Sequence, residues 1–286
     1  MIPLSLGYSS LAGRIALLGI ERIVVKKLGE NTDSAAATLV FMGFGGVMLI
    51  PLLFFTEFRY HPILWLTLLS GLVYSAGFFL YVKSLSIGEA SLVSPLYNFN
   101  ILFLLVFSAV ILNETITIYK IAGVLLMIYG MSFLNRQRSL LLSLKAVFYD
   151  RACRLMIVCS LLVAVGRAID GYIVHRVPPI LYALAGSAAM MTYLTLYAVW
   201  ARKIPSVIEL IKKRPVLSVF SGTVNAYSYI LLLFAFTVIP VSVAEPVSML
   251  SMIVTVILAK YIFQERIRNR IIGAVIMLAG AWLLFV

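Results

Sequence analysis

The chain has 286 residues, of which 63% are hydrophobic and 12% are charged, and its mean hydropathy is +1.07. A soluble domain has about 25% charged residues, and so apolar a chain could not cover itself with polar surface. The net charge of +12 is scattered between apolar stretches, which argues against a nucleic-acid partner. The composition therefore predicts an all-α integral membrane protein of the cell membrane, because continuous apolar stretches of about 20 residues form spanning helices.

Ten apolar stretches follow one another along the chain. Five lie in the first half: Leu4–Val25, Ser34–Phe55, Ile63–Val82, Leu92–Leu112 and Ile116–Leu134. Five lie in the second half: Leu155–Val174, Ile180–Trp200, Val216–Val238, Val241–Phe263 and Ile271–Val286. We therefore expect a first unit of residues 1–135, a basic connector of residues 136–154 and a second unit of residues 155–286.

The two halves match each other at an offset of 151 residues. Ser91, Pro95 and Glu114 in the first half correspond to Ser242, Pro246 and Glu265 in the second. A match at a fixed period indicates an internal repeat. Because each repeat has five spans, the second crosses the membrane in the opposite sense to the first. The sequence thus predicts ten transmembrane helices as two inverted five-helix repeats, an arrangement typical of transporters with a binding site near the bilayer midplane.

Two pairs of glycines recur at the same spacing in the last span of each half. Gly123 and Gly130 match Gly273 and Gly280. Small residues seven apart share one helix face and allow close helix packing. We expect a close helix contact there.

The loops after odd-numbered spans carry 17 basic residues and those after even-numbered spans carry 3. The positive-inside rule then predicts that the odd loops are cytoplasmic and that both termini lie outside.

The doubled pattern resembles the ten-helix, EamA-like permeases of the drug/metabolite transporter superfamily, over essentially the whole chain. The resemblance rests on Ser91, Pro95, Glu114 and Gly123 and on their counterparts at 242, 246, 265 and 273. It implies transport of small metabolites, amino acids or amphipathic compounds, usually out of the cell. It also implies cytoplasmic termini, in conflict with the charge count.

Four ionisable residues within the spans are candidates for function, because such residues are costly in a membrane. They are Arg14, Glu21, Arg167 and Asp170. Together they could bind the carboxylate and ammonium of a zwitterion, or an acid could exchange protons with the solvent to couple transport. The alternative is a set of structural ion pairs. Arg22, Lys26 and His175 are interpreted as interfacial anchors.

Aromatic and amide side chains could line the same cavity and grip a flat or cationic solute. The candidates for binding substrate are Tyr74, Tyr97, Asn98, Asn225 and Tyr227, and Tyr74 matches Asn225 at the 151-residue offset. Hydrogen bonding between helices would explain these residues equally well.

Glu114 and Glu265 end the fourth span of each half, which indicates a shared structural role, such as binding the backbone amides at the start of the next helix. We expect structural roles for Pro95 and Pro246 too. Glu245 precedes Pro246, so it is expected to mark a helix start or break, and it is a candidate gate.

No sequence motif of an enzyme or of a metal site is present, and Cys153 and Cys159 are interpreted as small buried residues. The sequence therefore predicts a secondary transporter without a cofactor, which moves a small organic solute by alternating access. A sugar-phosphate or other anion exchanger, a translocase for lipid-linked substrates and a non-transporting structural subunit are the alternatives.

Overall fold

The structure, a computed structural model, describes residues 4–56, 61–112, 117–131, 133, 145, 147–239, 241–265 and 267–283. Every regular element in these ranges is a helix. The first half contains α1 (Leu4–Gly29), α2 (Ser34–Leu49), η1 (Ile50–Phe55), η2 (Pro62–Trp65), α3 (Leu66–Ile87), α4 (Ala90–Val93), η3 (Ser94–Asn98), α5 (Phe99–Leu112) and α6 (Ile118–Met131). The second half contains α8 (Arg151–Ile173), α9 (Pro179–Trp200), α10 (Ile204–Lys213), α11 (Pro215–Phe236), α12 (Val241–Ser248), α13 (Ser251–Phe263) and α14 (Arg268–Leu283).

Local sequence sets several of these helix ends. Asp33 caps α2 by accepting hydrogen bonds from the amides of Ala35 and Ala36, and Asp150 caps α8 by accepting one from Cys153. Gln264 closes α13 with a positive φ of 56°.

Six helical segments of the described residues are long and apolar enough to cross a membrane. Three further apolar helices, in α6, α13 and α14, are shorter. α1 has 26 residues but carries several charged side chains, from Arg14 to Lys27. The predicted all-helical membrane fold is thus confirmed, whereas the count of ten spans stays a prediction.

The fourth predicted span of each half is interrupted. In the first half, η3 separates α4 from α5, with Pro95 in its first turn. In the second half the break falls between α12 and α13, around Met249 and Leu250. The expectation that Glu245 marks a start or break was therefore wrong, because Glu245 lies inside α12 and the chain turns only after Ser248.

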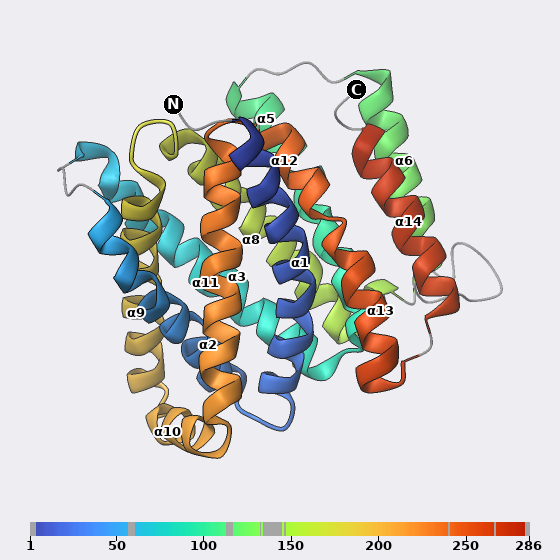
Figure 1. Cartoon of the computed structure of the whole chain (residues 1–286). Helices are drawn as coiled ribbons and strands as arrows, with labels where there is room; N and C mark the ends of the chain where they lie inside the picture. The colour runs from blue at the N-terminus through green and yellow to red at the C-terminus, as the bar shows by residue number, and fades with distance from the viewer. Residues whose placement is uncertain are drawn as a thin grey trace.

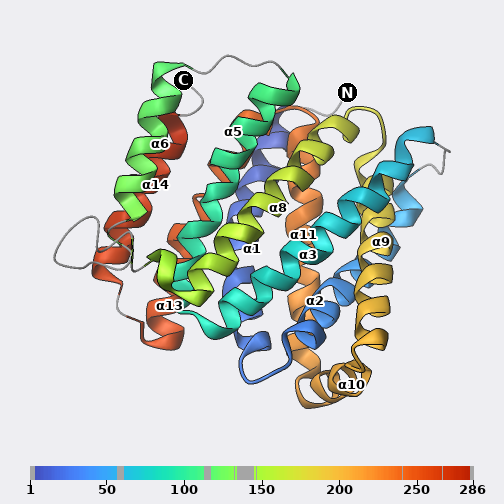
Figure 2. The same cartoon turned by 180° about the vertical axis from the view of Figure 1, so that it is seen from behind.

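Helices of one half pair with helices of the other. α1 packs along α11, α3 along α8, α2 along α9 and α6 along α14. Exchanging each helix for its counterpart in the other half reproduces the same pairings. In Figure 1, α1 and α8 run in opposite directions, and so do α2 and α9. The start of α1 and the end of α14 lie at the same end of the molecule (Figures 1 and 2).

The predicted glycine contact is found between α6 and α14. A Cβ added at Gly130 would lie 2.8 Å from the backbone nitrogen of Met277, and one added at Gly280 would lie 2.7 Å from the carbonyl oxygen of Gly123. The two backbones are so close here that neither position 130 nor position 280 has room for a side chain.

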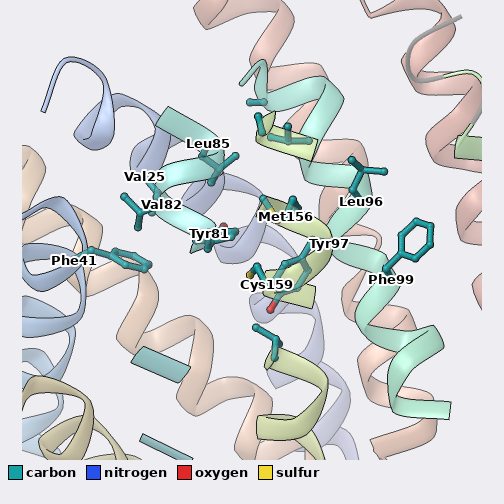
Figure 3. Close-up of a cluster of buried hydrophobic side chains, with 14 of the residues drawn as sticks. Val25, Phe41, Tyr81, Val82, Leu85, Leu96, Tyr97, Phe99, Met156 and Cys159 are labelled. Carbon is teal, nitrogen blue, oxygen red and sulfur yellow. The ribbon is translucent and has the colours of Figure 1, made fainter. Parts of the chain in front are cut away.

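The buried apolar core extends through both halves. Figure 3 shows Leu96, Tyr97 and Phe99 at the break of the fourth helix, with Met156 and Cys159 of α8 beside Tyr97. Cys153 and Cys159 are both free and buried, as predicted.

Candidate functional site

A cavity lies at the junction of the two halves. Its charged and amide-bearing lining residues are Arg14 and Glu21 of α1, Arg167 of α8 and Asn225 of α11. The rings of Tyr74, Phe78, Tyr97 and Tyr229 contribute much of the remaining wall. The volume of this cavity is about 30 Å³. That is room for about two waters, so a larger solute enters only if the surrounding helices move.

The wall formed by α1 and α11 holds charged groups with few partners. Arg14 is buried and donates through Nη1 to the Ser228 hydroxyl, while its Nε has no partner among the described residues. Glu21 is 2% exposed and accepts two long hydrogen bonds, of 3.3 Å from Tyr81 and 3.4 Å from Asn225. Arg14 and Glu21 form no ion pair with each other in the described structure. This wall therefore retains unused hydrogen-bonding capacity for both signs of charge.

The wall formed by α3 and α8 is fully paired around Arg167. Its Nη1 lies 2.9 Å from Oδ2 of Asp170, and its Nε lies 3.1 Å from Oε1 of Glu245. The guanidinium also stacks over the rings of Tyr74 and Tyr229. Two carboxylates thus neutralise one buried cation.

Asp170 is surrounded by hydroxyl groups as well. It accepts hydrogen bonds of 2.6 Å from Tyr74, 2.6 Å from Tyr182 and 3.2 Å from Tyr229. Glu245 also accepts from the side-chain amide of Asn100 at 3.0 Å. Buried carboxylates with this many donors are held in one geometry.

The two acids occupy corresponding positions. Glu21 contacts Asn225 of α11, and Asp170 contacts Tyr74 of α3. Since Tyr74 and Asn225 match at the 151-residue offset, each acid meets the same position on the third helix of the opposite half. The ionisable residues of the two halves can be aligned at an offset of 149 residues, which pairs Glu21 with Asp170, or of 153 residues, which pairs Arg14 with Arg167. These contacts favour the offset of 149.

The interpretation of Arg22 as an interfacial anchor is wrong, because its side chain is fully buried in the protein. None of its three guanidinium nitrogens has a hydrogen-bond partner among the described residues, and the group lies 5.3 Å from the centre of the Tyr97 ring. The helical phase explains the error: Arg22 is three residues after Gly19, which packs against Ser251 and Val254 of α13, so it faces protein.

Lys26 also belongs to a buried cluster rather than to the membrane surface. Its ammonium lies 2.9 Å from Oε1 of Glu265, and it donates to the Gly88 carbonyl. Glu265 accepts from the backbone amides of Ala90 and Ser91 at the start of α4. Burial alone would raise the pKa of Glu265, but the hydrogen bonds from Ser91 and Lys26 outweigh it and lower that pKa. Glu265 thus meets a helix start in the opposite half, not the start of the next helix.

The remaining predicted residues divide between the network and other places. Tyr97 lines the cavity. Glu245 is not part of the lining but forms an ion pair with Arg167, which is. Asn98 is buried and donates to the Met252 sulfur, away from the cavity lining. Tyr227 is 39% exposed and does not line the cavity, because two residues along a helix turn it away from Asn225. Pro95 is the second residue of η3, and Pro246 lies within α12. His175 is exposed, and Glu114 lies outside the described residues.

Some contributors to the site carried no sequence signal. Tyr182 of α9 donates a hydrogen bond to Asp170. The predicted span that contains Tyr182 has no charged residue, so there was no reason in the sequence to select this tyrosine. Ser228 contacts Arg14, and a serine in an apolar helix resembles any other small packing residue.

The sequence model of the EamA-like transporter family matches twice, over residues 5–136 and 151–286. Among solved structures, a chain titled "Crystal structure of protein" is 14% identical, with a TM-score of 0.59, covering 98% of this chain and 97% of that one. This likeness concerns the fold alone. The comparison with curated proteins gives no match.

Two repeats of apolar helices around a buried polar cavity define a multi-pass integral membrane protein. The chain belongs to the EamA-like transporter family. Membership indicates a non-enzymatic transporter of the drug/metabolite transporter superfamily, working in a lipid bilayer on a small-molecule substrate.

Proposed function

We propose that the protein is a secondary active transporter that moves a small zwitterionic, partly apolar metabolite across the cell membrane, by export or exchange. The observation that carries this proposal is the cavity itself. It is lined by Arg14 and Glu21 from one half and by Arg167 and Asn225 from the other. A solute bound there touches both halves, as alternating access requires.

An inverted pair of five-helix halves is the framework for this movement. The opposite directions of α1 and α8 and the exchange symmetry of the helix pairings support it. The narrow cavity supports it too, because loading a solute requires the halves to part on one side.

The substrate class follows from the unequal walls. Arg14 offers a carboxylate its Nε, which has no partner among the described residues, and Glu21 offers an ammonium group two oxygens that accept long hydrogen bonds. The rings of Tyr74, Phe78 and Tyr97 suit an apolar body. A sugar phosphate fits less well, because Arg167 is already neutralised by two carboxylates and Glu21 would repel a dianion.

Transport by the full chain in proteoliposomes tests the proposal. We expect exchange of labelled apolar amino acids, weak or no exchange of sugar phosphates, and loss of exchange in Arg14→Gln. A hydrogen bond to a charged group contributes about 1.5–3 kcal/mol, so substrate affinity in this variant should fall by about tenfold or more.

Arg176→Gln is the matched control, since Arg176 is exposed and donates to the backbone oxygen of Tyr172. It should transport like the parent. Exchange of sugar phosphates in preference to zwitterions would contradict the substrate class, and no exchange of any small organic solute would contradict transport.

A further inference from the structure

The short helix α10 lies across the foot of α9 and α11, at one end of the bundle (Figures 1 and 2). One face is anchored to the protein: Leu210 is buried, and Ile204, Val207 and Ile211 pack against the core. Its position is therefore fixed relative to the membrane helices beside it.

Two further contacts hold the ends of α10. Lys203 forms an ion pair of 2.7 Å with Asp33, the cap of α2. Arg214 donates to the carbonyl oxygens of Lys27, Leu28 and Glu30, where α1 ends. α10 is thus connected to the turn between α1 and α2.

The opposite face of α10 is exposed and combines cations with apolar groups. A shallow groove there is lined by Pro205, Ile208, Glu209, Lys212 and Lys213 and extends to Ile204 of the anchored face. Ile208 is 49% exposed, and beyond the two ends of the helix Trp200 and Val216 are 80% and 81% exposed. Exposed tryptophan and aliphatic groups at the end of a spanning helix are typical of the lipid headgroup region.

The charge of this segment is one-sided. Residues 202–214 contain five basic side chains and one acidic side chain. Glu209 pairs with Lys213, and Asp33 pairs with Lys203. Arg202 and Lys212 have no ion-pair partner in the described part of the chain. Two unpaired cations beside apolar groups that reach lipid match a phosphate on a glycerolipid.

We propose that the exposed face of α10 and the turn before it, with Lys212 on the helix and Arg202 two residues before its start, bind the headgroups of anionic phospholipids. Trp200, Ile208 and Val216 contact the acyl boundary, while the two cations contact phosphate. This inference does not depend on the transported solute. It concerns the leaflet that α10 faces.

Tryptophan quenching offers a local test. The protein carries Trp65, Trp200 and Trp282, so Trp65→Phe/Trp282→Phe leaves Trp200 as the only tryptophan, next to α10. This parent is reconstituted into phosphatidylcholine bilayers in which brominated phosphatidylglycerol replaces a rising fraction of the lipid. We expect quenching at low fractions well above that given by brominated phosphatidylcholine, because the anionic lipid is enriched around Trp200, and we expect added salt to reduce the difference.

In the same background, Arg202→Gln/Lys212→Gln should lower the affinity for phosphatidylglycerol by about tenfold, because each basic residue near the surface contributes several-fold. Lys145→Gln/Lys260→Gln is the matched control, since it removes the same charge from exposed residues outside α10 and should quench like the parent. Equal quenching by the two brominated lipids would overturn the proposal, and so would a double variant that quenches like the parent. An equal loss in the control would assign the effect to total charge and overturn it as well.

Discussion

The two contacts between the halves hold the same kinds of residues but satisfy them differently. Along α3 and α8, Arg167 meets Asp170 and Glu245, and three tyrosines complete the shell of Asp170. Along α1 and α11, the hydrogen bonds that Arg14 and Glu21 make within the described residues are all with neutral groups, and those of Glu21 are long. The difference teaches that corresponding positions need not be satisfied alike: the α3–α8 contact is closed by ion pairs, whereas the α1–α11 contact has unused hydrogen-bonding groups among the described residues, which our proposal assigns to the substrate.

The strongest way to break this comparison is to remove Arg167. Arg167→Met leaves Asp170 and Glu245 buried without their cation, and breaking a buried ion pair costs about 3–5 kcal/mol. We expect a large fall in the thermal unfolding midpoint of the purified protein. Arg14→Met, the matched variant on the other wall, should lower it much less. Equal losses would show that the two walls are equally structural.

Glu21→Gln addresses function on the less paired wall. It keeps the side-chain shape and one acceptor oxygen, and the Tyr81 hydroxyl or the reoriented Asn225 amide can accept from the new NH2 group, so the unfolding midpoint should change little. Solute flux in proteoliposomes should fall by about tenfold or more, because a charge-assisted contact of about 1.5–3 kcal/mol is lost. Unchanged, pH-dependent flux in this variant would remove Glu21 from the mechanism.

Arg22→Met is compared with Arg167→Met. Arg22 is a buried cation with no hydrogen-bond partner in the described structure, whereas Arg167 is paired with two carboxylates. Replacing an unsatisfied buried charge by an apolar side chain of similar length removes a desolvation cost. We expect an unfolding midpoint equal to or above that of the parent. A fall comparable with that of Arg167→Met would mean that Arg22 has a stabilising partner.

The smallest expected effect concerns Glu265. Its pKa is lower in the folded protein than in the unfolded chain, so its charge stabilises the fold above about pH 4.3 and this contribution is lost as pH falls further. Glu265→Gln should therefore lower the unfolding midpoint slightly at pH 7. The gap from the parent should stay nearly constant down to about pH 4.3 and narrow only as pH falls below that value. A gap that stays constant below that value as well would contradict an ionised role.

Much of the fold could be predicted because the apolar stretches and the 151-residue match determine where helices begin and which helices correspond. Glu21, Asp170 and Arg167 could be singled out because ionisable residues are rare in membrane helices. Their partners could not, since a contact such as that of Asp170 with Tyr182 depends on how two consecutive helices, α8 and α9, are rotated against each other.

The error at Arg22 has the same origin. A cation near a helix end faces either lipid headgroups or protein, and only the packing of Gly19 against α13 decides between them. The break after Ser248 was missed because proline disfavours helix in the preceding residue, yet Pro246 is accommodated inside the short helix α12.

The charged character of α1 has a consequence for how the chain is made. Arg14, Glu21 and Arg22 each oppose insertion of an isolated helix, and an arginine does so by about 2.5–3.5 kcal/mol when it lies at the helix centre. The helices that bury them, α11 and α13, leave the ribosome more than 180 residues later. The first helix is therefore synthesised well before it can take its final place in the membrane. The polar centre is assembled only after the second half has left the ribosome.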